Sequence, residues 1–375
     1  MTAVESFPLS GGLVLRSGDR DRLVLLNEVA AVVWELFTAG LEVREIAGCL
    51  AERFDRPAAE VAADVQALVA GWRAEGLLRG PDSGAVPPRP PMAPPAAAPL
   101  VDATVRLART TVRIRSWVPA LGPTITGRLL HRRVTEPADV TVDVHADGAD
   151  YVALCEGGEV VREDDVPHAV SSLYRLFLRL DNPGARFLAF AHAACLVSEG
   201  RTVLACGCSG RGKTTLAAGL LGQGFTYLGD EISGVVAGDF SIRSLPTALS
   251  IKVAGLETVR ELVGATPTAW SPTGESVVGA FVDPATLGPT ATEAGRPAAI
   301  VFPRFTRDAA STSARLTPLE AFGELIDAGI AVDQSVFSGG TPARLIEWVE
   351  TTPCYRLTYG SFDDAHRGVR AVLGG

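Results

Sequence analysis

The segment best suited to chemistry is a glycine-rich motif at residues 207–214, which reads Gly-Cys-Ser-Gly-Arg-Gly-Lys-Thr. Its spacing is that of a phosphate-binding loop, in which glycines adopt positive φ and turn successive N–H groups toward phosphate oxygens. The apolar run 202–205 precedes it and a helical pattern at 215–221 follows, so a helix N-terminus adds partial positive charge. We expect a bound nucleoside triphosphate, with Lys213 on its β and γ phosphates and Thr214 on Mg²⁺.

The predicted nucleotide contacts extend over the whole loop and the start of the helix: Gly207, Ser209, Gly210, Arg211, Gly212, Lys213, Thr214 and Thr215. Lysine is otherwise almost absent, because Lys213 and Lys252 are the only two in the chain. Lysine carries a compact ammonium on a flexible stem, so it can occupy sites where the planar guanidinium of arginine does not fit. Lys252 is therefore a second candidate for the nucleotide site, the alternative being an ordinary surface lysine.

A pair of carboxylates follows the loop helix. The run 225–229 is typical of a short strand and ends in Asp230 and Glu231. Beside a triphosphate, such a pair can hold Mg²⁺ and accept a proton from a hydroxyl nucleophile. His192, which precedes the loop strand, is either a further active-site residue or a structural histidine. The alternative for the acidic pair is a strand end that faces solvent.

Composition limits the class of protein. With 375 residues, 47% hydrophobic and 21% charged, the chain is long enough for two or three globular domains. A net charge of -9 argues against nucleic acid as a partner. The six cysteines form no C-x-x-C pair, which favours free thiols in a reducing cytosol, and no apolar run is long enough to span a membrane. We predict a cytoplasmic protein.

The elements that must position these residues fall on either side of a linker. Residues 81–99 are rich in Pro and Ala and predict an extended spacer. Before it, 12–16 and 22–26 predict a hairpin, and three helices follow at 27–37, 43–54 and 58–75, the first capped by Asn27. After it, strands are predicted at 101–107, 110–114, 140–144, 151–154 and 159–161, and helices at 170–180 and 187–196. The whole is a mixed α/β (α+β) chain.

The N-terminal pattern at 25–34 and 43–47, which closes with Trp72-Arg-Ala-Glu-Gly-Leu-Leu78, resembles the PqqD-like peptide-binding domain, the RiPP precursor recognition element. The resemblance implies a winged-helix-like domain over residues 1–80. Such a domain would bind the leader of a ribosomally made precursor peptide as an added strand at the sheet edge, beside the third helix. The alternative is a winged-helix module for dimerisation or DNA binding. Acidic residues on the third helix, Glu60, Asp64 and Glu75, argue against DNA.

Residues after the linker resemble the HPr-kinase-related branch of the phosphoenolpyruvate-carboxykinase-like fold. The likeness rests on His192-Ala-Ala-Cys-Leu, the glycine-rich loop, Leu228-Gly-Asp-Glu, the segment 244–252 and Val301-Phe-Pro-Arg304-Phe. It implies an ATP-binding kinase domain at 100–375, with Asp230 as the base and with Thr214, Asp230 and Glu231 on Mg²⁺. It further implies that His192 lies by the acidic pair and that Lys252 and Arg304 contact the nucleotide.

Two departures qualify this resemblance. Glu231 stands where the bifunctional kinase/phosphorylases have Asp, and their Gly-rich C-terminal signature has no counterpart. We therefore expect a kinase without phosphorylase activity, and hexamers are not implied, although a homo-oligomer stays open. The predicted function is ATP-dependent phosphorylation of a Ser or Thr hydroxyl in a precursor peptide. The alternatives are a non-catalytic, ATP-gated chaperone that presents the peptide to another enzyme, and a kinase for a small hydroxyl metabolite.

Overall fold

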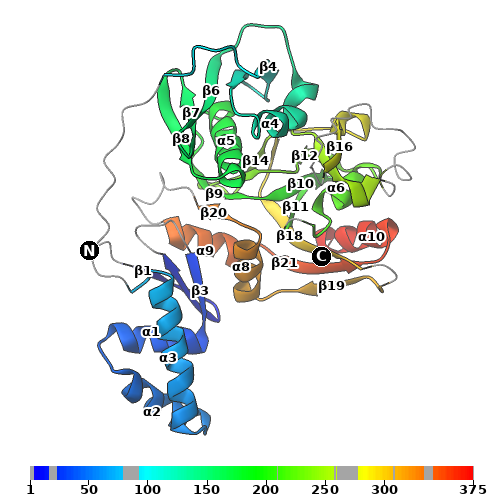
Figure 1. Cartoon of the computed structure of the whole chain (residues 1–375). Helices are drawn as coiled ribbons and strands as arrows, with labels where there is room; N and C mark the ends of the chain where they lie inside the picture. Colours follow the sequence, from blue (N-terminus) through cyan, green and yellow to red (C-terminus); the bar gives the residue numbers. More distant parts are fainter. Residues whose placement is uncertain are drawn as a thin grey trace. The chain divides into compact units, whose positions relative to one another are not determined.

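The computed structural model describes residues 4–16, 23–78, 93–208, 210–256, 259, 278–306, 309–332 and 341–374. The chain forms two compact units (Figure 1). The first contains Met1–Pro88 together with Thr317–Ile326, and the second contains Arg89–Leu316 together with Asp327–Gly375. A short helix from late in the sequence therefore belongs to the N-terminal unit.

The N-terminal unit is built from an antiparallel sheet and three helices. The strands, in the order β1-β2-β3, are β1 (Glu5–Leu9), β2 (Gly12–Arg16) and β3 (Leu23–Asn27). The helices are α1 (Glu28–Thr38), α2 (Val43–Phe54) and α3 (Ala58–Ala74). Asn27 caps α1 as predicted, since its side-chain oxygen accepts a hydrogen bond of 2.9 Å from Ala30 N. In the core, Trp34 and Trp72 pack edge to face with ring centroids 5.1 Å apart.

The late helix α8 (Pro318–Asp327) packs on this sheet. A Cβ added at Gly12 would lie 2.9 Å from Leu319 Cδ1, and one added at Gly323 would lie 3.7 Å from Leu25 Cδ2. Gly12 and Leu25 share the sheet face opposite Leu13, which packs against the three helices, because side chains alternate along a strand. The small sheet is thus covered on both faces within the unit.

The second unit opens with a five-stranded sheet in the order β4-β5-β6-β7-β8. Its strands are β4 (Val101–Arg106), β5 (Thr111–Ser116), β6 (Val140–Asp147), β7 (Asp150–Cys155) and β8 (Gly158–Glu163). The helices α4 (Gly122–Leu129) and α5 (Val166–Asp181) share one apolar core with it. The five strands and the α5 helix agree with the sequence prediction.

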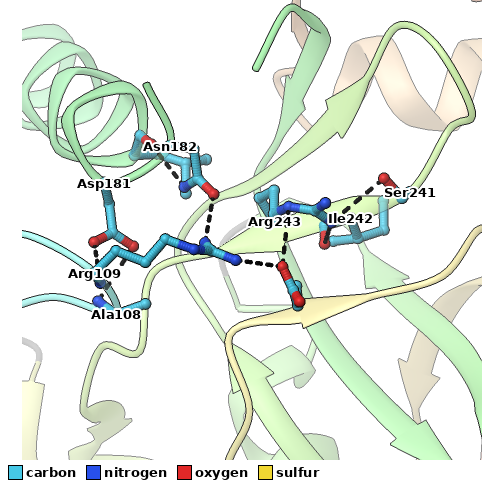
Figure 2. Close-up of polar contacts among 9 residues, drawn as sticks. Ala108, Arg109, Asp181, Asn182, Ser241, Ile242 and Arg243 are labelled. Atoms are coloured by element: carbon cyan, nitrogen blue, oxygen red, sulfur yellow. Dashed lines mark hydrogen bonds and ion pairs between the residues drawn. The ribbon is translucent and has the colours of Figure 1, made fainter. Parts of the chain in front are cut away.

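A polar network joins the turn between β4 and β5 to the neighbouring sheet (Figure 2). The Asp181 carboxylate accepts hydrogen bonds of 2.7–3.2 Å from three successive backbone N–H groups at residues 108–110. The side chains of Arg109 and Arg243 both contact Glu293, which belongs to β17. Because Asp181 ends α5, this network fixes the helix relative to the strands that follow.

The central sheet has six strands in the order β12-β10-β11-β18-β21-β19. They are β10 (Ala193–Ser198), β11 (Arg201–Cys206), β12 (Thr226–Gly229), β18 (Pro297–Phe305), β19 (Thr312–Arg315) and β21 (Cys354–Tyr359). The neighbours β11, β18 and β21 are parallel. The helices α6 (Lys213–Leu221) and α10 (Phe362–Gly374) share the buried core of this sheet and lie beside each other (Figure 1).

A second sheet, in the order β17-β14-β13-β9-β20, completes the unit. It contains β9 (Phe187–Ala191), β13 (Ser233–Val236), β14 (Ile242–Ser244), β17 (Glu293–Ala294) and β20 (Ala331–Val332). The remaining elements of the described residues are the antiparallel two-stranded sheet of β15 (Leu249–Lys252) and β16 (Val278–Val282), the helix α9 (Thr341–Thr351), and 3₁₀ turns at Leu130–Arg132, Val253–Gly255 and Pro284–Thr286.

The helix predicted over 187–196 is wrong. This segment forms two strands, β9 and β10, which belong to different sheets and are separated at His192. Nearly every residue of the run is buried, so its hydrophobicity has no period that could distinguish a buried helix from buried strands. The break places His192 where the chain passes from one sheet to the other.

Of the predicted linker, residues 93–99 form neither helix nor strand, and residues 81–92 lie outside the described part of the chain. Within that part, each helix is too short or too polar to cross a bilayer.

Candidate functional site

The glycine-rich loop follows the carboxyl end of β11 and leads directly into α6. Three of its glycines have positive φ, with 151° at Gly207 and 91° at both Gly210 and Gly212. Gly212 is the N-cap of α6 and adopts the left-handed conformation, which an L side chain enters only at a cost. The positive φ predicted for glycines of this loop is therefore present at these three positions. Ser209 lies outside the described residues, and Gly210 and Arg211 are exposed.

Lys213 occupies the first turn of α6 and points back over the loop. Its side chain is buried, with Nζ donating to the carbonyl oxygens of Gly207 at 2.6 Å and Cys208 at 3.4 Å. Burial lowers the pKa of Lys213, and the nearby charges of Asp230 and Glu231 oppose this shift. The ammonium thus contacts the loop and is close enough to the acidic pair for the charges to interact.

Asp230 and Glu231 directly follow β12, and the two carboxylates have different surroundings. Asp230 is 1% exposed, and among the described residues neither of its oxygens accepts a hydrogen bond of good geometry, although the Thr214 hydroxyl is close enough to lower its pKa. Burial and the charge of Glu231 raise the pKa of Asp230 to about 7, whereas the Thr214 hydroxyl and the Lys213 charge oppose the rise. A buried carboxylate without partners is costly, so these surroundings fit a cation or a proton-donating group.

His192 and Lys252 both lie close enough to Glu231 to interact with its charge. Nε2 of His192 lies 3.8 Å from a carboxylate oxygen of Glu231. Burial, together with the positive charges of Lys213, Arg128 and Lys252, lowers the pKa of His192 to about 3, so the ring is neutral. The charge of Lys252 also lowers the pKa of Glu231, although burial raises it overall. The two lysines of the chain therefore converge on one cluster of ionisable groups.

The structure adds a residue that sequence reasoning missed. Arg128, at the end of α4, forms an ion pair of 2.6 Å with Glu231, and its guanidinium lies 5.7 Å from the centre of the Tyr174 ring. It comes from the β-rich region well before the glycine-rich loop, and no local motif surrounds it. Only the tertiary fold brings it to the acidic pair.

The carboxyl ends of β18 and β21 form the other side of the loop. A Cβ added at Gly212 would lie 3.2 Å from the Tyr359 hydroxyl and 3.8 Å from Phe305 Cβ, and these two rings are 5.7 Å apart. Ligands of open α/β sheets bind at such carboxyl ends. Arg304 precedes Phe305 on β18 and so lies at this edge of the sheet, while the acidic pair lies at the end of β12.

The oxygen atoms at this site fit a Mg²⁺ ion that is bound together with a nucleotide. Asp230 offers two unsatisfied buried oxygens, and Thr214 and Thr215 lie in the first turn of α6. Among the described residues, no three His, Cys, Asp or Glu side chains are grouped as a protein-only metal site. This is compatible with Mg²⁺, which is usually bound by one or two carboxylates, waters and substrate phosphates.

Comparison with known protein families identifies one region of the chain. Residues 12–78 match the family model of Coenzyme PQQ synthesis protein D (PqqD). This confirms the PqqD resemblance, and the match covers the sheet from β2 onward and all three helices of the N-terminal unit. A comparison with curated proteins finds no match. The resemblance of the C-terminal region to HPr-kinase-related proteins stays a prediction.

Proposed function

We propose that the chain is an ATP-dependent kinase that phosphorylates a Ser or Thr hydroxyl of a ribosomally made precursor peptide. The observation that carries the proposal is the buried, unpaired carboxylate of Asp230 beside Lys213 at the N-terminus of α6. A carboxylate in this position has the surroundings of a general base, and Lys213 those of a phosphate ligand. The PqqD region supplies the peptide-binding part.

The proposed reaction is an in-line phosphoryl transfer. The acceptor oxygen attacks the γ-phosphorus, the bond from this phosphorus to the β,γ-bridging oxygen breaks, and Asp230 receives the hydroxyl proton. Backbone N–H groups of the loop and the ammonium of Lys213 hold the phosphates. Mg²⁺, held by Thr214 and at least one carboxylate of the acidic pair, would neutralise charge that develops on the phosphate oxygens. Neutral His192 lies beside Glu231 without adding charge.

The PqqD region gives the kinase a way to select its substrate. Among the described strands, β3 pairs only with β2, so β3 is an edge to which a peptide can add as a further strand. A linked recognition domain raises the effective peptide concentration at the active site to roughly the mM range. The kinase site itself can then bind the acceptor segment weakly, and the leader determines which peptide is phosphorylated.

The direct test is intact-mass spectrometry of the short peptide encoded beside this chain, after incubation with the full-length protein and MgATP. We expect a gain of about one phosphoryl group. Lys213→Ala and Asp230→Asn should abolish this gain, and Asp230→Asn should retain nucleotide binding, because the phosphates contact the loop and Lys213. No mass change with nucleotide bound would contradict the kinase and favour ATP-gated peptide presentation.

The role of the leader is best tested on the substrate. Deleting residues 1–80 would remove the sheet on which α8 packs and would expose Leu319, so a loss of activity would have two explanations. A leader-bearing peptide, a leaderless core and a core with a scrambled leader avoid this problem. We expect similar kcat for all three and a much lower KM for the native leader. Equal KM values would contradict leader recognition.

A further inference from the structure

Arg128 and Glu231 form a buried ion pair at the candidate site. Their oppositely charged atoms are 2.6 Å apart, and the two side chains are only 15% and 12% exposed. The pair joins α4 to the residue that follows Asp230 at the end of β12. At this distance and burial, the carboxylate of Glu231 is already engaged by a permanent cation.

Three other elements fix the position of Arg128. Its carbonyl oxygen accepts a hydrogen bond of 2.8 Å from Ala248 N, just before β15. Gly127 packs so closely on β16 that an added Cβ would lie 2.3 Å from the Phe281 ring. The guanidinium lies over the ring of Tyr174 on α5. Arg128 is therefore held in place independently of Glu231 and can position that side chain.

Asp230 differs from its neighbour because, among the described residues, it forms no ion pair, and neither of its buried oxygens accepts a hydrogen bond of good geometry. The Thr214 hydroxyl and the charges of Lys213 and Arg128 act on it more weakly. We propose that Arg128 is a positioning residue that keeps Glu231 in an ion pair, so that Asp230 is the only carboxylate of the acidic pair that is open to a metal ion and the acceptor hydroxyl. This refines the proposed kinase mechanism and rests on it. It also gives a reason for Glu rather than Asp at position 231, because the longer side chain extends toward α4.

The division of roles can be tested with Mn²⁺ in place of Mg²⁺. Free Mn²⁺ is measured by electron paramagnetic resonance while full-length protein is titrated in the presence of a non-hydrolysable ATP analogue. We expect Asp230→Asn to weaken Mn²⁺ binding by at least about tenfold, as loss of one charged ligand implies, and Glu231→Gln to change it by less than about twofold. Equal losses in the two variants would overturn the proposal, because Glu231 would then be a ligand. This measurement does not require phosphate transfer and so decides the point even if the kinase reaction fails.

A double-mutant cycle tests the part played by Arg128. Arg128→Met should lower the rate of phosphate transfer by about 10- to 100-fold, the usual cost of losing a group that orients a site residue. The double variant Arg128→Met/Glu231→Gln should recover most of this loss, because no uncompensated buried charge remains. Arg128→Lys should recover part of it. A double variant no faster than Arg128→Met would overturn the proposal, since Arg128 would then act on the substrate itself.

Discussion

The two neighbouring carboxylates should respond to isosteric substitution in opposite ways. Asp230→Asn removes a buried charge that has no partner, whereas Glu231→Gln removes the partner of a buried guanidinium. The first change should stabilise the metal-free protein and the second should destabilise it. Because both substitutions only replace an oxygen by an amide nitrogen, differences in side-chain volume do not enter the comparison.

The gain at Asp230 follows from its pKa, which burial and the charge of Glu231 raise from the ordinary value of 3.8 to about 7. Since one pKa unit is worth about 1.36 kcal/mol, full ionisation costs the folded state about 4 kcal/mol. The unfolded state ionises first as pH rises, so this cost is absent below about pH 4 and complete above about pH 7. Asp230→Asn should therefore raise the free energy of unfolding by about 4 kcal/mol at pH 8 and by little at pH 4.

Thermal unfolding in EDTA, followed from pH 4 to pH 8, provides the assay. A gain of this size corresponds to an increase in Tm on the order of 10 °C for the unit that contains the site. Glu231→Gln is the matched control and should lower stability by about 3–5 kcal/mol, because loss of the 2.6 Å ion pair leaves Arg128 buried without its partner. We expect this loss to outweigh the gain from removing a carboxylate whose pKa burial raises. A loss of stability in both variants, or an Asp230→Asn gain that does not depend on pH, would refute the reasoning.

Three further outcomes test the fold and the site. Trp72→Ala should destabilise the N-terminal unit by about 3–5 kcal/mol in denaturant, because it empties the centre of a small core, and a loss below about 1 kcal/mol would contradict this. Asp181→Ala should cost about 3 kcal/mol, since it leaves three N–H groups at 108–110 without their acceptor, whereas unchanged stability would show that water replaces the carboxylate. An acyl-phosphate derivative of ATP should acylate Lys213 or Lys252, the two lysines of the chain, and excess MgATP should prevent this reaction. If peptide mapping finds only the N-terminal amine labelled, the nucleotide binds elsewhere.

Local sequence signals predicted those parts of the fold whose structure is decided locally. Asn27 begins α1, and α2 has the predicted bounds, because capping and a 3.6-residue period act within one helix. The helix predicted over 187–196 is wrong, because the hydrophobicity of a segment that is buried on all sides has no helical or strand period. The order of the strands and the membership of α8 in the N-terminal unit depend on contacts between segments that are distant in the sequence. Local sequence motifs therefore do not predict them.

The candidate site likewise combines residues that local sequence can predict with residues that only the tertiary fold brings together. The glycine-rich loop, Lys213 and the acidic pair could be singled out from short-range spacing of residue types that would suit phosphate and Mg²⁺, and the structure brings them together. Arg128 could not, because an arginine that neutralises a carboxylate can come from any element that the fold brings near. The scarcity of lysine was a further useful signal: the structure places Lys252 close enough to influence both His192 and Glu231.

The features of this site that cost stability all favour the binding of phosphate and a cation. Among the described residues, a buried carboxylate without a well-formed hydrogen bond, a buried ammonium whose hydrogen bonds go to loop carbonyls and a left-handed N-cap each oppose folding in the free protein. A bound triphosphate with a divalent cation would compensate them together, since it supplies anionic oxygens for Lys213 and the loop and positive charge for Asp230. A purely structural role for these residues would provide no such compensation. These features are concentrated at one end of the central sheet, where β11 leads to α6 and β12 ends, and this concentration supports the proposed binding of a nucleotide there.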